Sequence, residues 1–425
     1  MTLTRPIAIL LLSFGAFQAQ AQLDSCNAFI KGNYVEVGVN WNGAYGSSVY
    51  PPTGYYKTAG GSNIPNAAAC DSVPNIGLGF VADVDKDGWT VGSPAFYGDY
   101  FVPGYPQEGW SILSSGSQAN AWNGSGSGSI HPAAACDPRI VGANIAYFTL
   151  GARRITVWQG IYDSIRITQV TSLDTTHLYF TTHVKFKNLS HSTRSNVYYL
   201  RTVDPDNDVV LSGDFTTKNK IESNYPGAAP LISTWGLHYA KAYLAMATLD
   251  TPAKAFILKM GLTPSHRIDS IYNGTDTTVK STDSLTADVG IGLVFNVGTL
   301  ASADSTVIAY AYVFRKVDND SALASTKKPF PLDTATVPNY VSNFTNSSNI
   351  NIYPNPFKEV MTLSGLQAAD VVSMFDMMGK KVEEWNISMD GNKSFNTQNL
   401  PTGVYILRIL DRNGAIKTRM PIQKL

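Results

Sequence analysis

Strict alternation of apolar and polar residues is the feature that most constrains this fold. In HLYFTTHVKF, residues 177–186, the side chains of Leu178, Phe180 and Val184 share one face, because successive strand residues point to opposite sides. Similar stretches rich in β-branched and aromatic residues recur at 34–41, 165–170, 196–203, 290–297 and 306–314. Strands of this kind need a second sheet to cover their apolar face. The sequence therefore predicts an all-β fold with a large antiparallel β-sandwich body.

Residues 1–21 have the pattern of a secretory signal peptide. Arg5 gives a short basic start, residues 7–17 form an apolar run, and Ala19 and Ala21 give the small-x-small cleavage pattern. The alternative is a membrane anchor, but the run is far shorter than the ~20 residues that a spanning helix needs. We expect cleavage after Ala21 and no transmembrane segment.

The charge balance narrows the range of partners. The formal net charge is zero and charged residues make up 15% of the chain, so neither a basic patch nor an acidic tail is present in the sequence. We therefore expect no nucleic-acid partner.

Because an exported chain enters an oxidising compartment, its cysteines are candidates for disulfide formation. Cys70 and Cys136 lie in a near-repeat, NAAACDSV and PAAACDPR, which favours a disulfide between them and leaves Cys26 over. The alternative is three unpaired buried thiols, since spacing alone does not determine the pairing.

Between residues 41 and 130 the chain becomes rich in Gly, Pro, Ser, Asn and aromatic residues. Long loops of this composition often carry function, and aromatic faces beside amides suit sugar rings or a protein partner. The candidate ligand-binding residues are Trp41, Tyr55, Tyr100, Trp110 and Trp122. The alternative is that these rings cover the open end of the sandwich as local cores.

Two short acidic segments are candidate calcium sites, since hard oxygen ligands at alternate positions suit Ca²⁺. In ADVDKDGW, Gly88 permits the sharp turn, but Pro94 stands where an EF-hand has its bidentate Glu. The candidate ligands are Asp83, Asp85, Asp87 and Asp99 in the first set, and Asp204, Asp206 and Asp208 in the second. The alternative for ADVDKDGW is a plain Asp/Gly-rich hairpin loop.

Catalytic residues are harder to find in the sequence. Glu36 and Glu108 would supply the two carboxylates of a glycosidase, but we expect Glu36 on a solvated strand face and Glu108 on a turn. GxSxG, HExxH and the phosphate-binding P-loop pattern do not occur in the sequence.

The body, residues 22–317, is followed by a Pro-, Ser-, Thr- and Asn-rich segment that we interpret as a linker, residues 318–349. A module of about 75 residues then begins at residue 350 and extends to residue 425. The spacing of its short strands predicts an Ig-like sandwich of about seven strands.

This last module carries four ordered motifs: YPNPF at 353–357, SMFDMMGKKV at 373–382, LPTGVYILRI at 400–409 and NGAIKTRMPIQKL at 413–425. It resembles the C-terminal sorting domain of the type IX secretion system of Bacteroidota. The motif positions are Tyr353, Pro354, Asn355, Pro356, Gly379, Gly403 and Tyr405. The resemblance implies recognition by the outer-membrane translocon, a secreted or outer-surface location, and either attachment to surface lipopolysaccharide or release.

For the body, the sequence favours a calcium-stabilised binding or adhesion module for a glycan or a surface. The alternative is a secreted polysaccharide-active hydrolase or lyase. Two carboxylates facing each other across an open aromatic cleft at roughly 5–9 Å would favour the enzyme.

Overall fold

The computed structural model describes residues 22–24, 27–47, 51–52, 55, 78–87, 99–101, 108–123, 139–205, 207, 212–238, 242–250, 252–258, 266–280, 282–327, 329–331, 350–354, 357–376, 381–401, 403–412 and 416–424.

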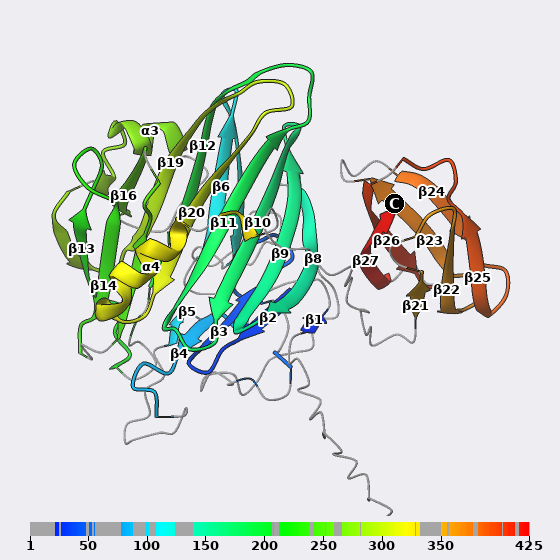
Figure 1. The fold of residues 1–425 in the computed structure, drawn as a ribbon, viewed down its shortest axis with the longest axis horizontal. Helices are drawn as coiled ribbons and strands as arrows, with labels where there is room; N and C mark the ends of the chain where they lie inside the picture. The colour runs from blue at the N-terminus through cyan, green and yellow to red at the C-terminus, as the bar shows by residue number, and fades with distance from the viewer. Residues whose placement is uncertain are drawn as a thin grey trace, which may run out of the picture.

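The body is built from large antiparallel sheets (Figure 1), which confirms the predicted all-β class. The nine-stranded sheet has the order β18 (Ser284–Ala287), β13 (Thr217–Ser223), β14 (Leu231–Gly236), β15 (Tyr243–Ala247), β20 (Ser305–Val313), β11 (Tyr179–Asn188), β10 (Ile165–Asp174), β9 (Arg153–Tyr162), β8 (Val141–Leu150). The six-stranded sheet has the order β17 (Val279–Lys280), β16 (Ala253–Leu258), β19 (Gly290–Leu300), β12 (Arg194–Val203), β6 (Glu108–Ser114), β7 (Ser117–Asn123).

A five-stranded sheet completes the body, with β1 (Gln22–Asp24), β2 (Asn27–Lys31), β3 (Val35–Val39), β4 (Phe80–Ala82) and β5 (Asp99–Phe101) in that order. It packs on the inner face of the nine-stranded sheet, where the rings of Phe80 and Phe180 lie 6.1 Å apart. Two short helices, α3 (Ile268–Asn273) and α4 (Asn319–Thr326), and the 3₁₀ turn η1 (Lys316–Asp318) lie outside the sheets.

Aromatic contacts between the sheets form the main core. Phe186 of β11 packs edge-on against Tyr199 of β12, with ring centroids 5.5 Å apart, and Tyr199 stacks on Tyr310 of β20 at 6.4 Å. These residues face inward because β11 alternates as the sequence predicts, and β10 pairs with β11 in an antiparallel ladder that places Ile167 opposite Phe186. β10 and β11 therefore form an antiparallel hairpin.

The segment expected to begin a linker at residue 318 instead continues the body. α4 packs on the outer face of the nine-stranded sheet, where Ala322 is fully buried in a cluster with Tyr179 and Tyr243. Phe330 is buried further along the same face, against Val157 and Val170. The apolar outer face of the sheet needs this cover, and the sequence pattern of the segment did not reveal it.

The C-terminal module has its own core and two sheets. One sheet is formed by β21 (Asn351–Tyr353), β22 (Val360–Leu366) and β25 (Gly391–Asn396), and the other by β24 (Lys381–Asn386), β23 (Val371–Asp376), β26 (Gly403–Leu410) and β27 (Ile416–Lys424). The Ig-like topology stays a prediction. Within the described ranges, every helix is too short or too polar to cross a membrane.

The role of α4 can be tested by placing a charge in its buried face. Ala322→Asp is expected to lower the free energy of unfolding by about 2–4 kcal/mol, because an unpaired carboxylate would be buried. Ala324→Asp is the matched control, since Ala324 is exposed on the same helix. Urea unfolding of both variants checks this, and equal losses of stability would contradict the packing of α4.

Candidate functional site

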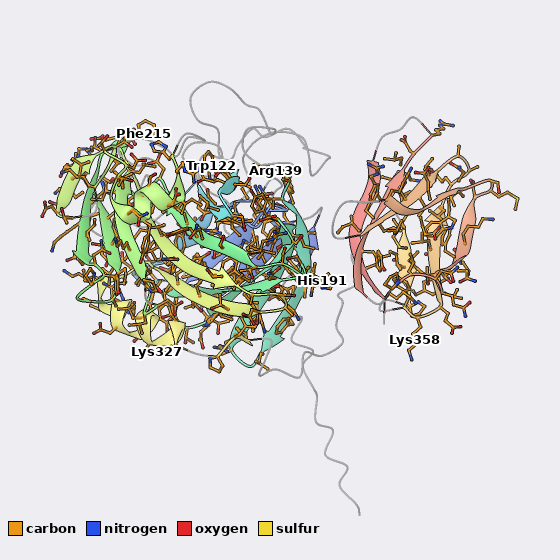
Figure 2. The ribbon with its side chains drawn as sticks, turned by 90° about the horizontal axis from the view of Figure 1, so that it is seen from above. Trp122, Arg139, His191, Phe215, Lys327 and Lys358 are labelled. Atoms are coloured by element: carbon orange, nitrogen blue, oxygen red, sulfur yellow. The ribbon has the colours of Figure 1, made fainter. Side chains whose placement is uncertain are left out.

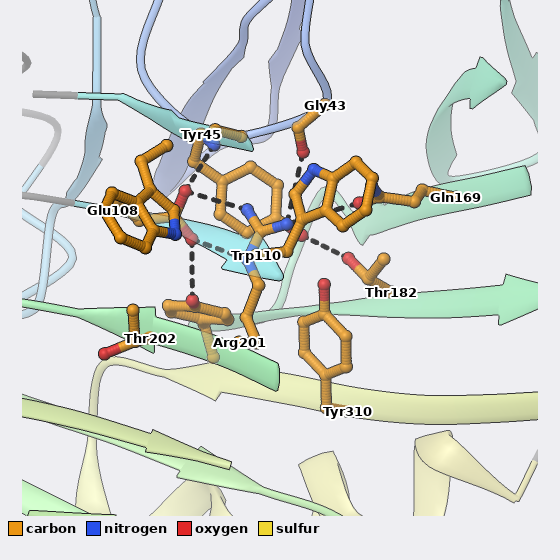
Figure 3. A network of polar contacts seen from close by, with 12 residues as sticks. Gly43, Tyr45, Glu108, Trp110, Gln169, Thr182, Arg201, Thr202 and Tyr310 are labelled. Atoms are coloured by element: carbon orange, nitrogen blue, oxygen red, sulfur yellow. Dashed lines mark hydrogen bonds and ion pairs between the residues drawn. The ribbon is translucent and has the colours of Figure 1, made fainter. Parts of the chain in front are cut away.

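The most concentrated polar group inside the body is the ion pair of Glu108 and Arg201 (Figure 3). Glu108 begins β6 and Arg201 lies in the adjacent strand β12. The guanidinium donates from Nε to Oε1 at 2.6 Å and from an Nη to Oε2 at 2.9 Å. This two-bond arrangement is the geometry that matches a guanidinium to a carboxylate most closely.

Further hydrogen bonds tie this pair to the other two sheets. The Tyr45 backbone N–H donates to Oε2 of Glu108 at 2.5 Å, and the Tyr312 hydroxyl donates to Oε1 at 2.9 Å. The remaining Nη of Arg201 donates to the Gly43 carbonyl and to Oε1 of Gln169, both at 3.2 Å. One ion pair thus links β6 and β12 to β10, to β20 and to the turn after β3.

Gly43 is required at this turn for two reasons. Its φ is +80°, which side chains rarely adopt. A Cβ there would lie 2.8 Å from both Nε2 of Gln169 and the Trp158 ring. The turn approaches the pair closely only because residue 43 has no side chain.

Aromatic rings enclose the pair. The Arg201 guanidinium lies 4.0 Å from the centroid of the Tyr45 ring, a favourable cation–π distance. Trp110 stacks with Tyr199 at 5.9 Å and meets Trp158 edge-on at 5.4 Å. Glu108 and Arg201 are both fully buried, so this centre is closed to solvent.

Burial dominates the ionisation of these groups. It raises the pKa of Glu108, and the Arg201 guanidinium opposes that rise. Burial also lowers the pKa of Arg201, but the Glu108 carboxylate together with Tyr310, Tyr312 and Tyr45 outweighs burial and holds that pKa well above its usual value. Burial raises the pKa of Tyr199 to about 12. The bidentate contact and two further donors to the carboxylate support a charged pair that connects the strands around it.

The two glutamates suggested for catalysis are therefore placed differently from our expectation. Glu108 lies within a buried strand and not on a turn, and Glu36 is fully buried in the middle of β3 and not on a solvated face. Lys31, the cross-strand partner of Glu36 on β2, neutralises it at 2.6 Å. Neither carboxylate faces an open cleft.

Most of the suggested ligand-binding rings are buried as well. Trp110 is fully buried and donates to the Asn42 carbonyl at 3.0 Å, and Trp122 is 5% exposed. Tyr55 is 7% exposed, and Trp41 packs partly buried against the main core. The three buried rings, Tyr55, Trp110 and Trp122, therefore expose little surface to a sugar. The side chain of Tyr100 lies outside the described residues.

The metal candidates are only partly described. Oδ1 of Asp83 accepts the Asp87 backbone N–H at 3.1 Å within a turn, while Asp85 and Asp87 are exposed. In the part of the chain that the structure describes, no three His, Cys, Asp or Glu side chains are grouped to hold a metal. Outside it lie the side chains of Asp99, Asp206 and Asp208 and all three cysteines, Cys26, Cys70 and Cys136. The calcium sites and the disulfide stay predictions.

Asp204 is the carboxylate with the most perturbed environment among these candidates. Burial, followed by the nearby negative charge of Asp288, raises its pKa to about 7. Asp288 itself has a raised pKa through burial and the charge of Asp214. Carboxylates that disfavour one another's ionisation are the arrangement that a cation would relieve.

The sorting motif folds into contacts within the C-terminal module. Phe357, the last residue of YPNPF, is fully buried and bridges to Lys424 near the chain end, whose Nζ donates to the Lys358 carbonyl. The Tyr405 hydroxyl donates to the Pro401 carbonyl at 2.6 Å, whereas Tyr353 is 47% exposed. Pro354 is exposed, Gly403 opens β26, and Asn355, Pro356 and Gly379 lie outside the described residues.

Sequence reasoning missed Arg201, Gln169 and Tyr312. An arginine inside the strand-like and largely apolar stretch NVYYLRTV was the available signal, because a buried charge needs a partner. Its partner lies 93 residues away in sequence, and no local pattern identifies it.

Residues 351–423 match the family model of the secretion system C-terminal sorting domain. This confirms the resemblance seen in the sequence, and the chain is a secreted or cell-surface protein carrying a type IX sorting domain. No curated protein matches the chain.

Solved structures with some likeness to this chain include several carbohydrate-active enzymes. A polysaccharide lyase has a TM-score of 0.25 and 10% identity over 76% of this chain and 40% of its own. Heparan sulfate lyase HepC from Pedobacter heparinus has a TM-score of 0.25 and 8% identity over 40% and 21%. A bacterial glucoamylase complexed with acarbose has a TM-score of 0.36 and 10% identity over 72% and 34%. The chain spans less than half the length of each of these three proteins, and TM-scores this low support no conclusion about its fold or function.

The structural role of the ion pair can be measured with a double-mutant cycle. Arg201→Met is expected to lower the free energy of unfolding by about 3–5 kcal/mol, because it leaves the Glu108 carboxylate buried without its cation. Combining it with Glu108→Leu is expected to cost less than the two single changes together. Guanidinium unfolding followed by tryptophan fluorescence gives these values.

The control for this cycle is Lys220→Met, which breaks the partly exposed ion pair with Glu222 and is expected to cost under ~1 kcal/mol. If Arg201→Met were as mild as this control, the pair would not tie the sheets together.

The raised pKa of Asp204 is expected to make the free energy of unfolding decrease as the pH rises. Between pH 4 and 7 the folded chain retains a proton that the unfolded chain releases, so the free energy of unfolding falls as pH rises, on the order of 4 kcal/mol in total. Asp204→Asn is expected to remove this fall and to be more stable than the wild type at pH 8. Melting temperatures across this pH range, recorded with chelator and with added calcium, check this. No difference between the two proteins in chelator would refute the burial argument.

Proposed function

We propose that the body is a binding or adhesion module for a glycan or surface, delivered by the sorting domain, and not a hydrolase or lyase. This proposal rests on the burial of Glu36 and Glu108 in the core, where the side chains of Lys31 and Arg201 neutralise them. A glycosidase needs two carboxylates that reach the scissile bond. These two instead stabilise a scaffold.

The way the scaffold anchors its loops supports binding. Nδ2 of Asn42 donates to the Trp122 carbonyl at 3.0 Å, and Nδ2 of Asn144 donates to the Asn40 carbonyl at 3.0 Å. These bonds bring the chain after β3, the end of β7 and the start of β8 together. In the view of Figure 2, Trp122 and Arg139 are labelled on the same side of the body.

The segments that connect these hydrogen-bonded strand ends have the amino-acid composition of binding loops. Residues 48–77 contain several Gly, Ser, Asn and Tyr residues, and residues 124–138 are rich in Gly and Ser. Tyr supplies rigid contact area and the small polar residues supply adaptable hydrogen bonds. A rigid β-scaffold whose anchored strands are joined by sequence of this composition suits recognition.

We further propose that calcium stabilises the loops of Asp83 and Asp204, as their alternating aspartates suggest. The burial of Asp204 beside Asp288 supports this, because a cation would offset the mutual repulsion. Recognition by the translocon is followed, in our proposal, by attachment to surface lipopolysaccharide or by release.

A glycan array combined with product analysis tests the binding proposal. The purified chain is expected to retain particular glycans without shortening them over a day at neutral pH, because its buried glutamates cannot reach a glycosidic bond. Glu108→Gln, if folded, is expected to bind the same glycans. New reducing ends or unsaturated products, absent from a heat-denatured control, would establish the enzyme instead.

A further inference from the structure

The outer face of the six-stranded sheet carries a cluster of tyrosines that none of the roles above uses. α3 lies across this face, beside β16 and β19 (Figure 1), and buries Ile268 and Ile271 against it. At its end Tyr272 packs on Tyr198 of β12, with ring centroids 5.5 Å apart at 57°. The helix therefore covers part of the face and leaves an aromatic border.

Two polar side chains lie on the same face beside these rings. Asn296 of β19 is directly opposite Tyr198 in the ladder, so the two side chains are neighbours. Lys254 of β16 is opposite Val294, two residues from Asn296 and therefore on the same face. Its Nζ lies 4.5 Å from the centroid of Tyr272 and donates to the Tyr272 carbonyl at 2.7 Å.

A third tyrosine reaches this cluster from the turn between β13 and β14. Tyr225 is 38% exposed, and its position is fixed by the preceding residue, Asn224. Nδ2 of Asn224 donates to the Ala255 carbonyl at 2.9 Å, and its Oδ1 accepts the Ala255 backbone N–H at 2.8 Å. After burial, the proximity of Tyr225 and Tyr198 raises the pKa of Tyr272, which agrees with three rings in one cluster.

The charge of this cluster is positive. Among the described residues, Lys254 has no carboxylate partner, and its ammonium is held at the ring and carbonyl of Tyr272. Amide and ammonium donors beside aromatic faces are the groups that bind a sugar carrying an acidic substituent, since the rings pack on the pyranose face and the cation pairs with the acid.

We propose that Tyr198, Tyr225, Tyr272, Asn296 and Lys254 form a binding site for an acidic glycan, one bearing carboxylate or sulfate groups. The site deepens the proposed binding function and rests on it. Tyr225 and Tyr198 supply the packing faces, Tyr272 supports them, and Asn296 and Lys254 select the hydroxyls and the acidic group. The binding strength is expected to fall with ionic strength, because Lys254 is partly exposed to solvent.

The test uses two pairs of polymers that differ only in charge: polygalacturonate with its methyl ester, and dextran sulfate with dextran. Affinity electrophoresis of the full chain is expected to show retardation by the acidic member of one pair and not by its neutral counterpart. The pair that responds identifies carboxylate or sulfate as the recognised group.

Tyr225→Ala and Lys254→Met are each expected to weaken this binding about tenfold, a loss of 1.4 kcal/mol. Lys254→Met is also expected to reduce the preference for the charged member. The matched controls are Tyr353→Ala, a similarly exposed tyrosine of the sorting domain, and Lys220→Met, an exposed lysine of the nine-stranded sheet. Both controls are expected to bind as the wild type does.

Two results would overturn the proposal separately. If the acidic polymers bind the wild type and both site variants equally, the site is wrong while the binding function survives. If neither acidic polymer binds the wild type, the acidic-glycan assignment is wrong, and the glycan array decides the binding function independently.

Discussion

The body depends on one buried interaction, the ion pair of Glu108 and Arg201. Removing two charges from water is costly, and their attraction offsets that cost only with close geometry and fully used hydrogen-bonding capacity. Here Tyr45, Tyr312 and Gln169 use that capacity from three different parts of the fold. A pair of this kind favours the single arrangement of the sheets in which every partner is present, and for this chain we infer that it selects the packing of the sheets.

The same burial keeps Glu36 and Glu108 away from solvent. Our proposed binding function therefore uses surface features, namely the loop anchors near Asn42 and the tyrosine cluster near Tyr225. The interior positions both, since Asn42 is bonded into the core turn and Asn224 is bonded to β16. In the function we propose, binding is a property of the surface that the scaffold presents, and the sorting domain directs the chain to the secreted or cell-surface location.

The strands were predictable from sequence and the site was not, for a physical reason. Alternation along residues 177–186 reports which side of one strand is apolar, and β11 confirmed it. Alternation does not describe β3, because this strand is buried on both faces. The sequence therefore placed Glu36 on a solvated face, whereas the structure buries it and Lys31 neutralises it. α4 was missed because its sequence lacks a marked apolar stripe, although Ala322 is fully buried. The sorting domain was recognisable because its motifs are local.

We propose that the buried contacts of the interior stabilise the fold and that the ligand binds on the outer face of the six-stranded sheet. Hydrogen–deuterium exchange of the full chain with and without polygalacturonate or dextran sulfate tests it most directly. We expect added protection in peptides covering residues 222–228, 252–258 and 268–275, and no change at 108–113. Protection that appears only at 108–113, or at none of these segments when the polymer is bound, would contradict the account.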